Sequence, residues 1–478
     1  MTLSLFAAAE KHPERTALIA EGRSFSYAAL AQRVACVAAE LADRGLLKGL
    51  SPVGVVARPN LASLELMHAL IAFRVPLLLL HPSLPASEQQ ALLERAGARA
   101  LLSSEESALA SSGRSLHPAA EPEVPALPLA IVPTSGTSGK PKLVVLSRGA
   151  FIASALASSG NLPLGERDRW LLCLPPSHVG GFSILTRTLL AGSTLVAFDA
   201  GSAGLSRKLP ELAQSLVENL VSVISLVPTL LDAWLTSLST WTPPPSLRAV
   251  LVGGAGLSQA LLQRARARGV PLLSTYGLTE ACSQVTTTRP SGFPNVNGGV
   301  VSSGFALPGV ELKIEADSRI CVRSPTLCSG YVDGDAPIDE HGWFHTQDRG
   351  FIDGSGELYV LGRASELIVS AGENVDPLRV EGVLSSAPGV TGAIVFGVPD
   401  ERYGELVACA VTTHPNFDEA EVSRYLCEHL SRAELPRRLA RMPSFVTLPN
   451  GKIDRSAVRK ESSERLVSFE HPRAHKPQ

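Results

Sequence analysis

Ten residues with the sequence PTSGTSGKPK, from Pro133 to Lys142, combine two glycines, two lysines and four hydroxyl side chains. Free backbone N–H groups, hydroxyls and cations together suit a loop that binds phosphate. A Walker P-loop needs about four residues between its glycines and a Ser or Thr after its lysine. Here two residues separate Gly136 from Gly139, and Pro141 follows Lys140. The stretch therefore predicts a loop that grips a departing polyphosphate. A solvated linker is the alternative, and two lysines directly after an apolar strand disfavour it.

Four further stretches carry chemically suggestive residues far apart along the chain. VGGAG, from Val252 to Gly256, follows an expected strand and allows the backbone to approach a flat ligand. STYGLTE, from Ser274 to Glu280, combines an aromatic ring, hydroxyls and a carboxylate. Asp348 in HTQDRG has an acceptor-only carboxylate that suits ribose hydroxyls, and Lys452 lies in the glycine-turned loop LPNGKIDR. These residue types are typical of a nucleotide site.

Each of these residues also has a purely structural interpretation. Tyr276 could pack in the core, and Asp348 could shape a turn. His178 in PPSHVGG could be a structural histidine or could gate an acyl pocket, and Lys452 could be a solvated hairpin lysine. Only the ordered set of stretches favours the functional interpretation.

In this order, the five stretches resemble the adenylate-forming superfamily of acyl-CoA synthetases, peptide-synthetase adenylation domains and luciferases. The resemblance runs from SFSYAAL, at Ser24–Leu30, to Lys452, which is nearly the whole chain. It implies an enzyme that activates a carboxylic acid with ATP and Mg²⁺ and passes the acyl group to CoA. A small-molecule carboxylic acid, ATP and CoA are therefore the expected partners.

The resemblance also implies roles for individual residues. The β- and γ-phosphates would be held by Thr134, Ser135, Gly136, Thr137, Ser138, Gly139 and Lys142. Adenine and ribose would be held by Gly254, Ala255, Tyr276, Asp348 and Arg363. The catalytic residues would be Lys452, Thr279, Glu280 and His178, with Glu280 as the Mg²⁺ ligand. CoA would contact Ala371, Gly372 and Glu373, and Ser365 would be the hinge between two domains.

The chemistry of acid activation explains these residue types. A carboxylate is a poor electrophile, so its oxygen must first attack the α-phosphorus of ATP and expel pyrophosphate. Two anions then meet, and Mg²⁺ on Glu280 together with the Lys452 ammonium would neutralise the developing charge. Because Lys140 and Lys142 would hold the departing phosphates, a further cation must come from the small domain.

Within the superfamily, the chain is most similar to the o-succinylbenzoate:CoA ligases of menaquinone biosynthesis. These enzymes often have serine at the hinge, as at Ser365, and share the motifs YGLTEACSQ and SHVGGFSILTR. Their substrate class implies an aromatic diacid, whose second carboxylate needs a buried partner. The predicted substrate residues are Arg187, Ser274, Ser283 and Gln284. The alternative for Arg187 is a solvent-facing position on a surface helix.

Several other functions remain open on the same residues. A medium-chain or aryl acid:CoA ligase would use the same ATP site. A stand-alone adenylation domain that loads a carrier protein is a further alternative. A non-catalytic nucleotide-binding module is disfavoured, because Glu280 and Lys452 would have no use there.

Composition narrows the class of protein. The chain has 478 residues, 45% of them hydrophobic and 18% charged, with a formal net charge of −2. A nearly neutral chain gains little from nucleic acid or an acidic membrane, so neither is an expected partner. The cysteines occur singly and suggest neither a zinc site nor disulfides, which favours a reducing, cytoplasmic location. No signal peptide or membrane span is expected, and the oligomeric state, a homo-oligomer included, is left open.

The elements that must position these residues follow an α/β pattern. Short apolar runs predict strands at 53–56, 77–80, 100–102, 129–132, 170–174, 194–198, 221–226 and 249–252. Helix-length stretches lie between most of them, which predicts a large multi-layer α/β domain over 1–363. Strands at 393–398, 407–411 and 439–446 and a helix at 419–430 predict a smaller, mobile α+β domain over 364–461. Residues 462–478 are expected to form a frayed tail.

Overall fold

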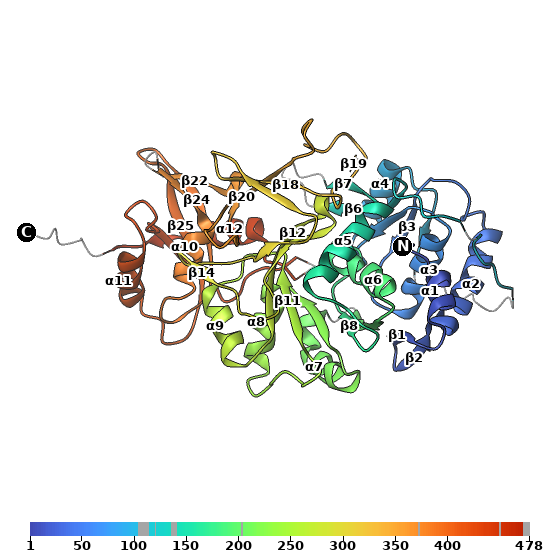
Figure 1. The fold of residues 1–478 in the computed structure, drawn as a ribbon. Coiled ribbons are helices and arrows are strands. Elements are labelled where there is room, and N and C mark those ends of the chain that lie inside the picture. The colour runs from blue at the N-terminus through green and yellow to red at the C-terminus, as the bar shows by residue number, and fades with distance from the viewer. Residues whose placement is uncertain are drawn as a thin grey trace, which may run out of the picture.

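The computed structural model, which describes residues 1–103, 114–119, 121–134, 141–201, 204–370, 373–448 and 451–471, contains a nine-stranded sheet (Figure 1). The strand order is β16-β13-β12-β11-β10-β8-β9-β1-β2. The strands are β1 (Thr16–Ala20), β2 (Arg23–Ser26), β8 (Arg169–Leu172), β9 (Thr194–Ala197), β10 (Val223–Leu226), β11 (Ala249–Gly253), β12 (Leu272–Leu278), β13 (Ser283–Thr287) and β16 (Phe305–Ala306). The strands from β1 through β9, β8, β10 and β11 to β12 run parallel, as the predicted α/β pattern requires.

A second, six-stranded sheet lies on the other side of a helical layer. Its order is β19-β7-β6-β4-β3-β5. The strands are β3 (Val53–Val56), β4 (Leu77–Leu80), β5 (Leu101–Leu102), β6 (Pro128–Thr134), β7 (Lys142–Ser147) and β19 (Gly330–Tyr331). All four leucines of β4 are buried, because helices or strands cover both faces of this parallel strand.

Helices fill the layers around the two sheets. They are α1 (Leu5–Lys11), α2 (Tyr27–Asp43), α3 (Leu61–Ala72), α4 (Ala86–Ala96), α5 (Arg148–Asn161), α6 (Val179–Ala191), η3 (Leu205–Arg207), α7 (Leu209–Glu218), α8 (Pro228–Ser237) and α9 (Gln259–Ala267). One apolar core joins α2, α3, α5 and α6 to both sheets, and a second joins α7, α8 and α9 to the opposite face of the larger sheet. On β8, Trp170 and Leu172 belong to the first core and Leu171 to the second, as strand alternation requires. The large multi-layer α/β domain predicted from the sequence is confirmed.

A smaller antiparallel sheet connects the large domain to the rest of the chain. Its order is β17-β18-β20-β21, with β17 (Glu311–Ile314), β18 (Arg319–Arg323), β20 (Phe344–Ile352) and β21 (Leu358–Arg363). The short hairpin of β14 (Val296–Asn297) and β15 (Val300–Val301) precedes it, and η5 (Ala364–Glu366) follows it. The domain boundary predicted between 363 and 364 therefore falls between β21 and η5.

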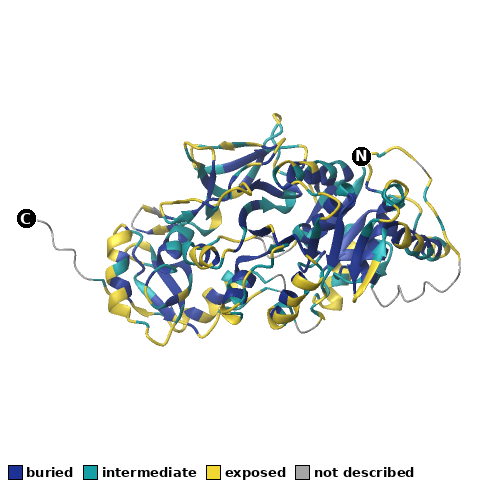
Figure 2. Ribbon diagram, turned by 60° about the horizontal axis from the view of Figure 1, so that its bottom comes forward, coloured by how far each residue is buried: buried dark blue, intermediate teal, exposed yellow. Residues whose placement is uncertain are grey.

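The small domain has the predicted mixed composition. Its strands are β22 (Ile368–Ser370), β23 (Glu373–Val375), β24 (Val390–Asp400), β25 (Gly404–Thr413), β26 (Arg438–Arg441) and β27 (Val467–Ser468). Its helices are α10 (Pro377–Leu384), α11 (Glu419–His429) and α12 (Arg455–Ser463). Figure 2 shows the buried residues concentrated in the strands of both domains and the exposed residues on the outward helix faces.

The tail predicted from residue 462 differs from the structure over its first part. β27 pairs with β26, and Phe469 is only 2% exposed in the apolar core of the small domain. The sequence shows no periodicity there, so a single buried aromatic residue and a two-residue strand gave no recognisable pattern. Residues 472–478 lie outside the described residues. None of the described helices combines the length and hydropathy needed to cross a bilayer.

Candidate active site

The hairpin of β6 and β7 brackets the predicted phosphate loop. β6 ends at Thr134, β7 begins at Lys142, and these two residues are paired. The Lys142 ammonium lies 4.9 Å from the centroid of the Tyr331 ring, and the Tyr331 hydroxyl donates to Glu280 Oε1 at 3.1 Å. The structure therefore brings a predicted phosphate-binding lysine and the predicted Mg²⁺ ligand to the same tyrosine. The loop residues Ser135, Gly136, Thr137, Ser138 and Gly139 lie outside the described residues.

A tight connection between β12 and β13 positions Thr279 and Glu280. Both lie in η4 (Thr279–Ala281), directly after the carboxyl end of β12, where open α/β sheets bind ligands. A Cβ at Gly277 would lie 1.7 Å from the Ser283 carbonyl oxygen, so only glycine fits there. Cys282 and Ser283 have φ values of 52° and 90°, a region that non-glycine residues rarely adopt. The strained turn fixes the direction in which the Glu280 carboxylate leaves the sheet.

The predicted adenine and ribose residues meet at one edge of this sheet. Gly254, with a φ of 81°, and Ala255 are exposed directly after β11. The Tyr276 hydroxyl donates to Asp348 Oδ2 at 2.7 Å, and Arg363 Nε lies 3.6 Å from Asp348 Oδ1. Burial and the neighbouring Asp348 carboxylate raise the pKa of Tyr276 well above its usual value, so the phenol stays protonated. Asp348 thus keeps a neutral donor on one oxygen and a cation near the other.

We expect Tyr276→Phe to raise the KM for ATP about 3- to 10-fold, because the variant removes one hydrogen bond to a charged group. The ring that would stack on adenine is retained, so kcat should change less than KM. Initial rates over a range of ATP concentrations measure both constants. An unchanged KM would show that the Tyr276–Asp348 hydrogen bond has no part in nucleotide binding.

The small domain delivers Lys452 into this site. Lys452 lies in a hairpin in which Leu448 N–H donates to the Lys452 carbonyl oxygen at 2.7 Å and Gly451 has a φ of 81°. The Thr229 hydroxyl, at the start of α8, donates to the Gly451 carbonyl oxygen. A Cβ on Gly254 would lie 2.9 Å from Lys452 Cε and 3.4 Å from Lys452 Nζ. The lysine therefore lies directly over the glycine predicted to flank adenine.

The charges around Lys452 favour an anionic ligand. Burial lowers the pKa of Lys452, the Arg363 cation lowers it further, and Asp348 acts in the opposite direction. Burial, followed by the His81 ring and the Lys452 ammonium, lowers the pKa of His178 to about 4. His178 is therefore neutral at pH 7, and its ring centroid lies 5.8 Å from that of His81. Sequence reasoning identified His178 but missed His81, which follows β4.

These protonation states make stability depend on pH. The pKa of His178 and that of the buried His68 are both lowered to about 4 from an ordinary value of 6.5, each mainly by burial. Between these values the unfolded chain binds the protons and the folded chain does not, so the contribution of these two histidines to stability is complete above pH 6.5 and is lost as the pH falls towards 4. Each histidine contributes a slope of up to about 1.4 kcal/mol per pH unit. Thermal unfolding measured between pH 4 and 6.5 gives the dependence of the unfolding free energy on pH. This dependence should be weaker in His178→Asn and in His68→Met than in the wild type. An unchanged dependence in both variants would show that neither buried histidine stays neutral in the folded protein.

Arg187 is a buried cation without an acidic partner among the described residues. It lies on α6, is 4% exposed, and places its guanidinium 5.7 Å from the Trp170 ring centroid. Nη2 donates to the Ser154 hydroxyl at 3.3 Å, whereas no described acceptor binds Nε. Burial lowers the pKa of Arg187 to about 10, which leaves the side chain charged at pH 7. The solvent-facing alternative for Arg187 is therefore wrong, because α6 lies inside the large domain.

The predicted polar substrate residues lie on β12 and β13, and Ser154 connects Arg187 to the turn between these strands. The Ser154 hydroxyl donates to the Cys282 carbonyl oxygen at 2.7 Å, which links Arg187 to the turn that carries Ser283. Gln284 is 6% exposed, and no described donor reaches its Oε1. Ser274 is 5% exposed, and its backbone is held by Thr288. A buried cation and a buried acceptor with incomplete hydrogen bonding are features of a polar ligand pocket.

The structure describes the predicted hinge residue and one of the three predicted CoA residues. Ser365 is exposed in η5, and the next residue, Glu366, pairs with Arg455 of α12 at 3.3 Å. Glu373 is exposed at the start of β23. Ala371 and Gly372 lie outside the described residues.

Contacts of α10 fix the small domain in this orientation. Arg349 of β20 pairs with Asp376, the N-cap of α10, at 3.1 Å. Arg379 Nη1 donates to the Gly298 carbonyl oxygen at 2.7 Å. These polar contacts and the Lys452 hairpin hold the small domain with its lysine over the predicted nucleotide residues.

Two family models match the chain. The model described as AMP-binding enzyme matches residues 5–332, and the model described as AMP-binding enzyme C-terminal domain matches residues 379–472.

Several known proteins are similar over nearly their whole length. The 2-succinylbenzoate–CoA ligase of Listeria monocytogenes serotype 4b (strain F2365) is 32% identical over 469 residues, which cover 94% of this chain and 97% of that protein. The o-succinylbenzoate CoA synthetase of Bacillus subtilis in complex with its acyl-adenylate intermediate superposes with a TM-score of 0.83 at 28% identity, covering 96% of this chain and 98% of that chain. The Bacillus subtilis enzyme in complex with ATP and a magnesium ion gives a TM-score of 0.82 at 28% identity, covering 95% and 98%.

Proposed function

The chain belongs to the AMP-binding enzyme family, and we propose that it is an ATP-dependent acid:CoA ligase that activates 2-succinylbenzoate through an acyl-adenylate. The superfamily resemblance and the α/β fold predicted from the sequence are confirmed. The similar proteins from Listeria and Bacillus bear names that state this activity, and one was solved with the acyl-adenylate.

The nucleotide would lie across the carboxyl ends of β11 and β12. Its triphosphate would reach Thr134 and Lys142, and its ribose would reach Asp348 and Arg363. Glu280 is half-exposed and offers carboxylate oxygens, the ligand type that Mg²⁺ prefers, so this residue fits a magnesium site. When bound there, Mg²⁺ would neutralise charge on the transferred phosphate.

The position of Lys452 carries the proposal of acyl-adenylate chemistry. Its ammonium lies over Gly254, and the charges of Arg363 and Asp348 act on it. From there it would attract both the acid carboxylate and the α-phosphate and so offset their repulsion as the new P–O bond forms. The neutral His178 ring would line the acid side of the site without adding charge.

The environment of Arg187 supports a diacid as the substrate. A buried cation is costly unless an anion pairs with it, and the described residues provide no such anion. The aromatic carboxylate of 2-succinylbenzoate would complete this pair, and the succinyl carboxylate would then face the α-phosphate. Ser283 and Gln284 would add hydrogen bonds directly or through water.

The thioester step would require a second orientation of the small domain. Ser365 is the proposed hinge between domains 1–363 and 364–461, and Ala371, Gly372 and Glu373 are the proposed CoA residues. Rotation about the hinge would withdraw Lys452 after adenylation and admit the thiol, which attacks the acyl carbon and releases AMP. We place the reaction in the cytoplasm, in agreement with the seven free cysteines.

A substrate panel tests the assignment against its alternatives. Pyrophosphate exchange reports the adenylation step, and thioester formation reports transfer to CoA. We expect exchange with 2-succinylbenzoate and the corresponding thioester when CoA is added. Preference for medium-chain or simple aryl acids would support the broader acid:CoA ligase. Exchange without any thioester would instead support a carrier-loading adenylation enzyme.

A further inference from the structure

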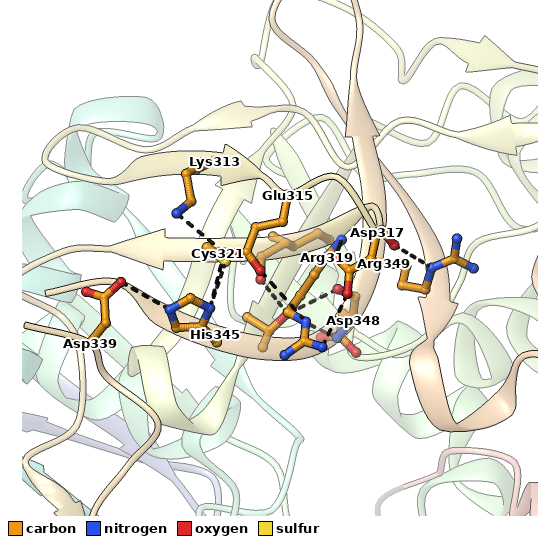
Figure 3. Close-up of polar contacts among 11 residues, drawn as sticks. Lys313, Glu315, Asp317, Arg319, Cys321, Asp339, His345, Asp348 and Arg349 are labelled. Atoms are coloured by element: carbon orange, nitrogen blue, oxygen red, sulfur yellow. Dashed lines mark hydrogen bonds and ion pairs between the residues drawn. The ribbon is translucent and has the colours of Figure 1, made fainter. Parts of the chain in front are cut away.

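Three side chains of metal-ligating types meet on the β17–β18–β20 sheet, and none of them is a predicted nucleotide residue. Within the described part of the chain, Glu315, Cys321 and His345 form one group whose ligand atoms all lie within 4.8 Å of one another. Cys321 on β18 pairs with His345 on β20, and Glu315 begins the turn from β17 to β18 (Figure 3). The group thus joins the β17–β18 turn and β18 to β20, which follows later in the chain.

The distances between these atoms match a tetrahedral zinc site. Zinc–sulfur and zinc–nitrogen bonds of about 2.3 and 2.0 Å at a tetrahedral angle separate the two ligands by about 3.5 Å. Cys321 Sγ lies 3.5 Å from His345 Nδ1, and His345 Nδ1 lies 3.4 Å from Glu315 Oε1. The corresponding nitrogen–oxygen separation in a zinc site is about 3.4 Å. Two ligand pairs are therefore already spaced as zinc would require.

A second carboxylate orients the histidine for metal binding. His345 Nε2 lies 3.1 Å from Asp339 Oδ2, and Asp339 accepts N–H bonds from His341 and Trp343. A carboxylate only accepts, so Asp339 accepts the N–H of Nε2, and Nδ1 is the ring nitrogen that faces Cys321 and Glu315 and would bind the metal. A carboxylate that orients a ligand histidine in this way is a regular feature of zinc sites.

The ligand set also suits zinc by charge and type. A thiolate and a carboxylate balance a divalent cation, and thiolate with imidazole selects zinc over magnesium or calcium. Cys321 is buried, whereas Glu315 and His345 are partly exposed, so a water molecule can complete the tetrahedron. The nearby Lys313 Nζ, 3.4 Å from Glu315 Oε1, and Arg319 Nε, 4.0 Å from Glu315 Oε2, compete for the same carboxylate.

We propose that Glu315, Cys321 and His345 bind one zinc ion, with Asp339 as the residue that positions His345. The ion would connect the β17–β18 turn to β20. The same strand carries Asp348, three residues after His345. The ion therefore stabilises the sheet next to the nucleotide site without contacting the substrates. This inference does not depend on which acid the enzyme activates.

Zinc titration of chelator-treated full-length protein in competition with a chromophoric chelator tests the site. We expect one zinc ion per chain and at least about a 100-fold loss of affinity in Cys321→Ser and His345→Gln. Asp339→Asn should weaken binding about 10- to 100-fold, as other histidine-orienting carboxylates do. Lys313→Met should tighten binding, because it removes a competing cation. Cys427→Ser and His341→Gln, at exposed positions outside the group, are the matched controls and should bind like the wild type.

A spectroscopic readout identifies the thiolate as a ligand. Cobalt should give a sulfur-to-metal charge-transfer band in the wild type and none in Cys321→Ser.

His345 and Glu315 are partly exposed, so substitutions there are less disruptive than at the buried Cys321 and keep the test valid if Cys321→Ser does not fold. In that case His345→Gln and Glu315→Gln decide the result. No zinc binding by the wild type, or equal binding by the ligand variants and the two controls, would overturn the proposal.

Discussion

Replacing Lys452 with alanine is expected to slow acyl-adenylate formation about 10²- to 10³-fold, the usual cost of removing one preorganised charge from a reacting centre. Lys452 reaches the site from the small domain and lies over Gly254, where the α-phosphate of ATP is proposed to meet the acid. Transfer of a preformed acyl-adenylate to CoA should be nearly unchanged, because that step is proposed to use the other domain orientation.

Pyrophosphate exchange measures the first half-reaction, and thioester formation from synthetic acyl-adenylate measures the second. Lys460→Ala is a matched control, because Lys460 is an exposed lysine of the same domain and lies on α12. It should leave both half-reactions unchanged. An equal loss of both half-reactions in folded Lys452→Ala protein would contradict the proposal of two domain orientations.

Replacing Arg187 with leucine is expected to lower kcat/KM for 2-succinylbenzoate by 10²-fold or more, because leaving one member of a buried ion pair alone costs about 3–5 kcal/mol. The KM for ATP should stay nearly constant. Since the described residues offer Arg187 no acidic partner, a leucine of similar bulk should not lower the melting temperature. This combination separates a substrate-binding arginine from a structural one.

The matched substrate for this test is 4-oxo-4-phenylbutanoate, which keeps the reacting chain and lacks only the aromatic carboxylate. Wild type should strongly prefer the diacid, and Arg187→Leu should lose that preference without losing activity on the monoacid. Arg167→Leu, at an exposed position, serves as the control variant. If Arg187→Leu still prefers the diacid, residues other than Arg187 must bind the aromatic carboxylate.

Most of the fold could be predicted because its signals are local. The run Leu77–Leu80 and the strands before Gly254 and Thr134 are short apolar segments bounded by glycine or polar residues, the pattern of buried parallel strands. The same local patterns placed Gly254 and Thr279, because each directly follows the carboxyl end of such a strand. The pairing of Tyr276 with Asp348, by contrast, joins β12 to β20 of a different sheet.

Contacts between distant segments could not be predicted in the same way. Tyr331 reaches Glu280 only because the two-residue strand β19 pairs with β7, and a strand of that length leaves no periodic signal. His81 meets His178 because β4 ends beside the start of α6. The sequence argued against a zinc site because no C-x-x-C pair is present, yet Cys321 and His345 are neighbours across two strands. The spacing of residues along the sequence indicates a metal-ligating cluster only when its ligands lie in one turn or one loop.

Product analysis of one reaction mixture tests the proposed activity most directly. The purified chain is incubated with ATP, Mg²⁺, CoA and 2-succinylbenzoate, and the nucleotide, phosphate and thioester products are quantified by mass spectrometry. An acid:CoA ligase that works through an acyl-adenylate should give AMP, pyrophosphate and the 2-succinylbenzoyl thioester of CoA in equal amounts. Formation of ADP and phosphate, or of AMP without the thioester, would contradict the proposed function.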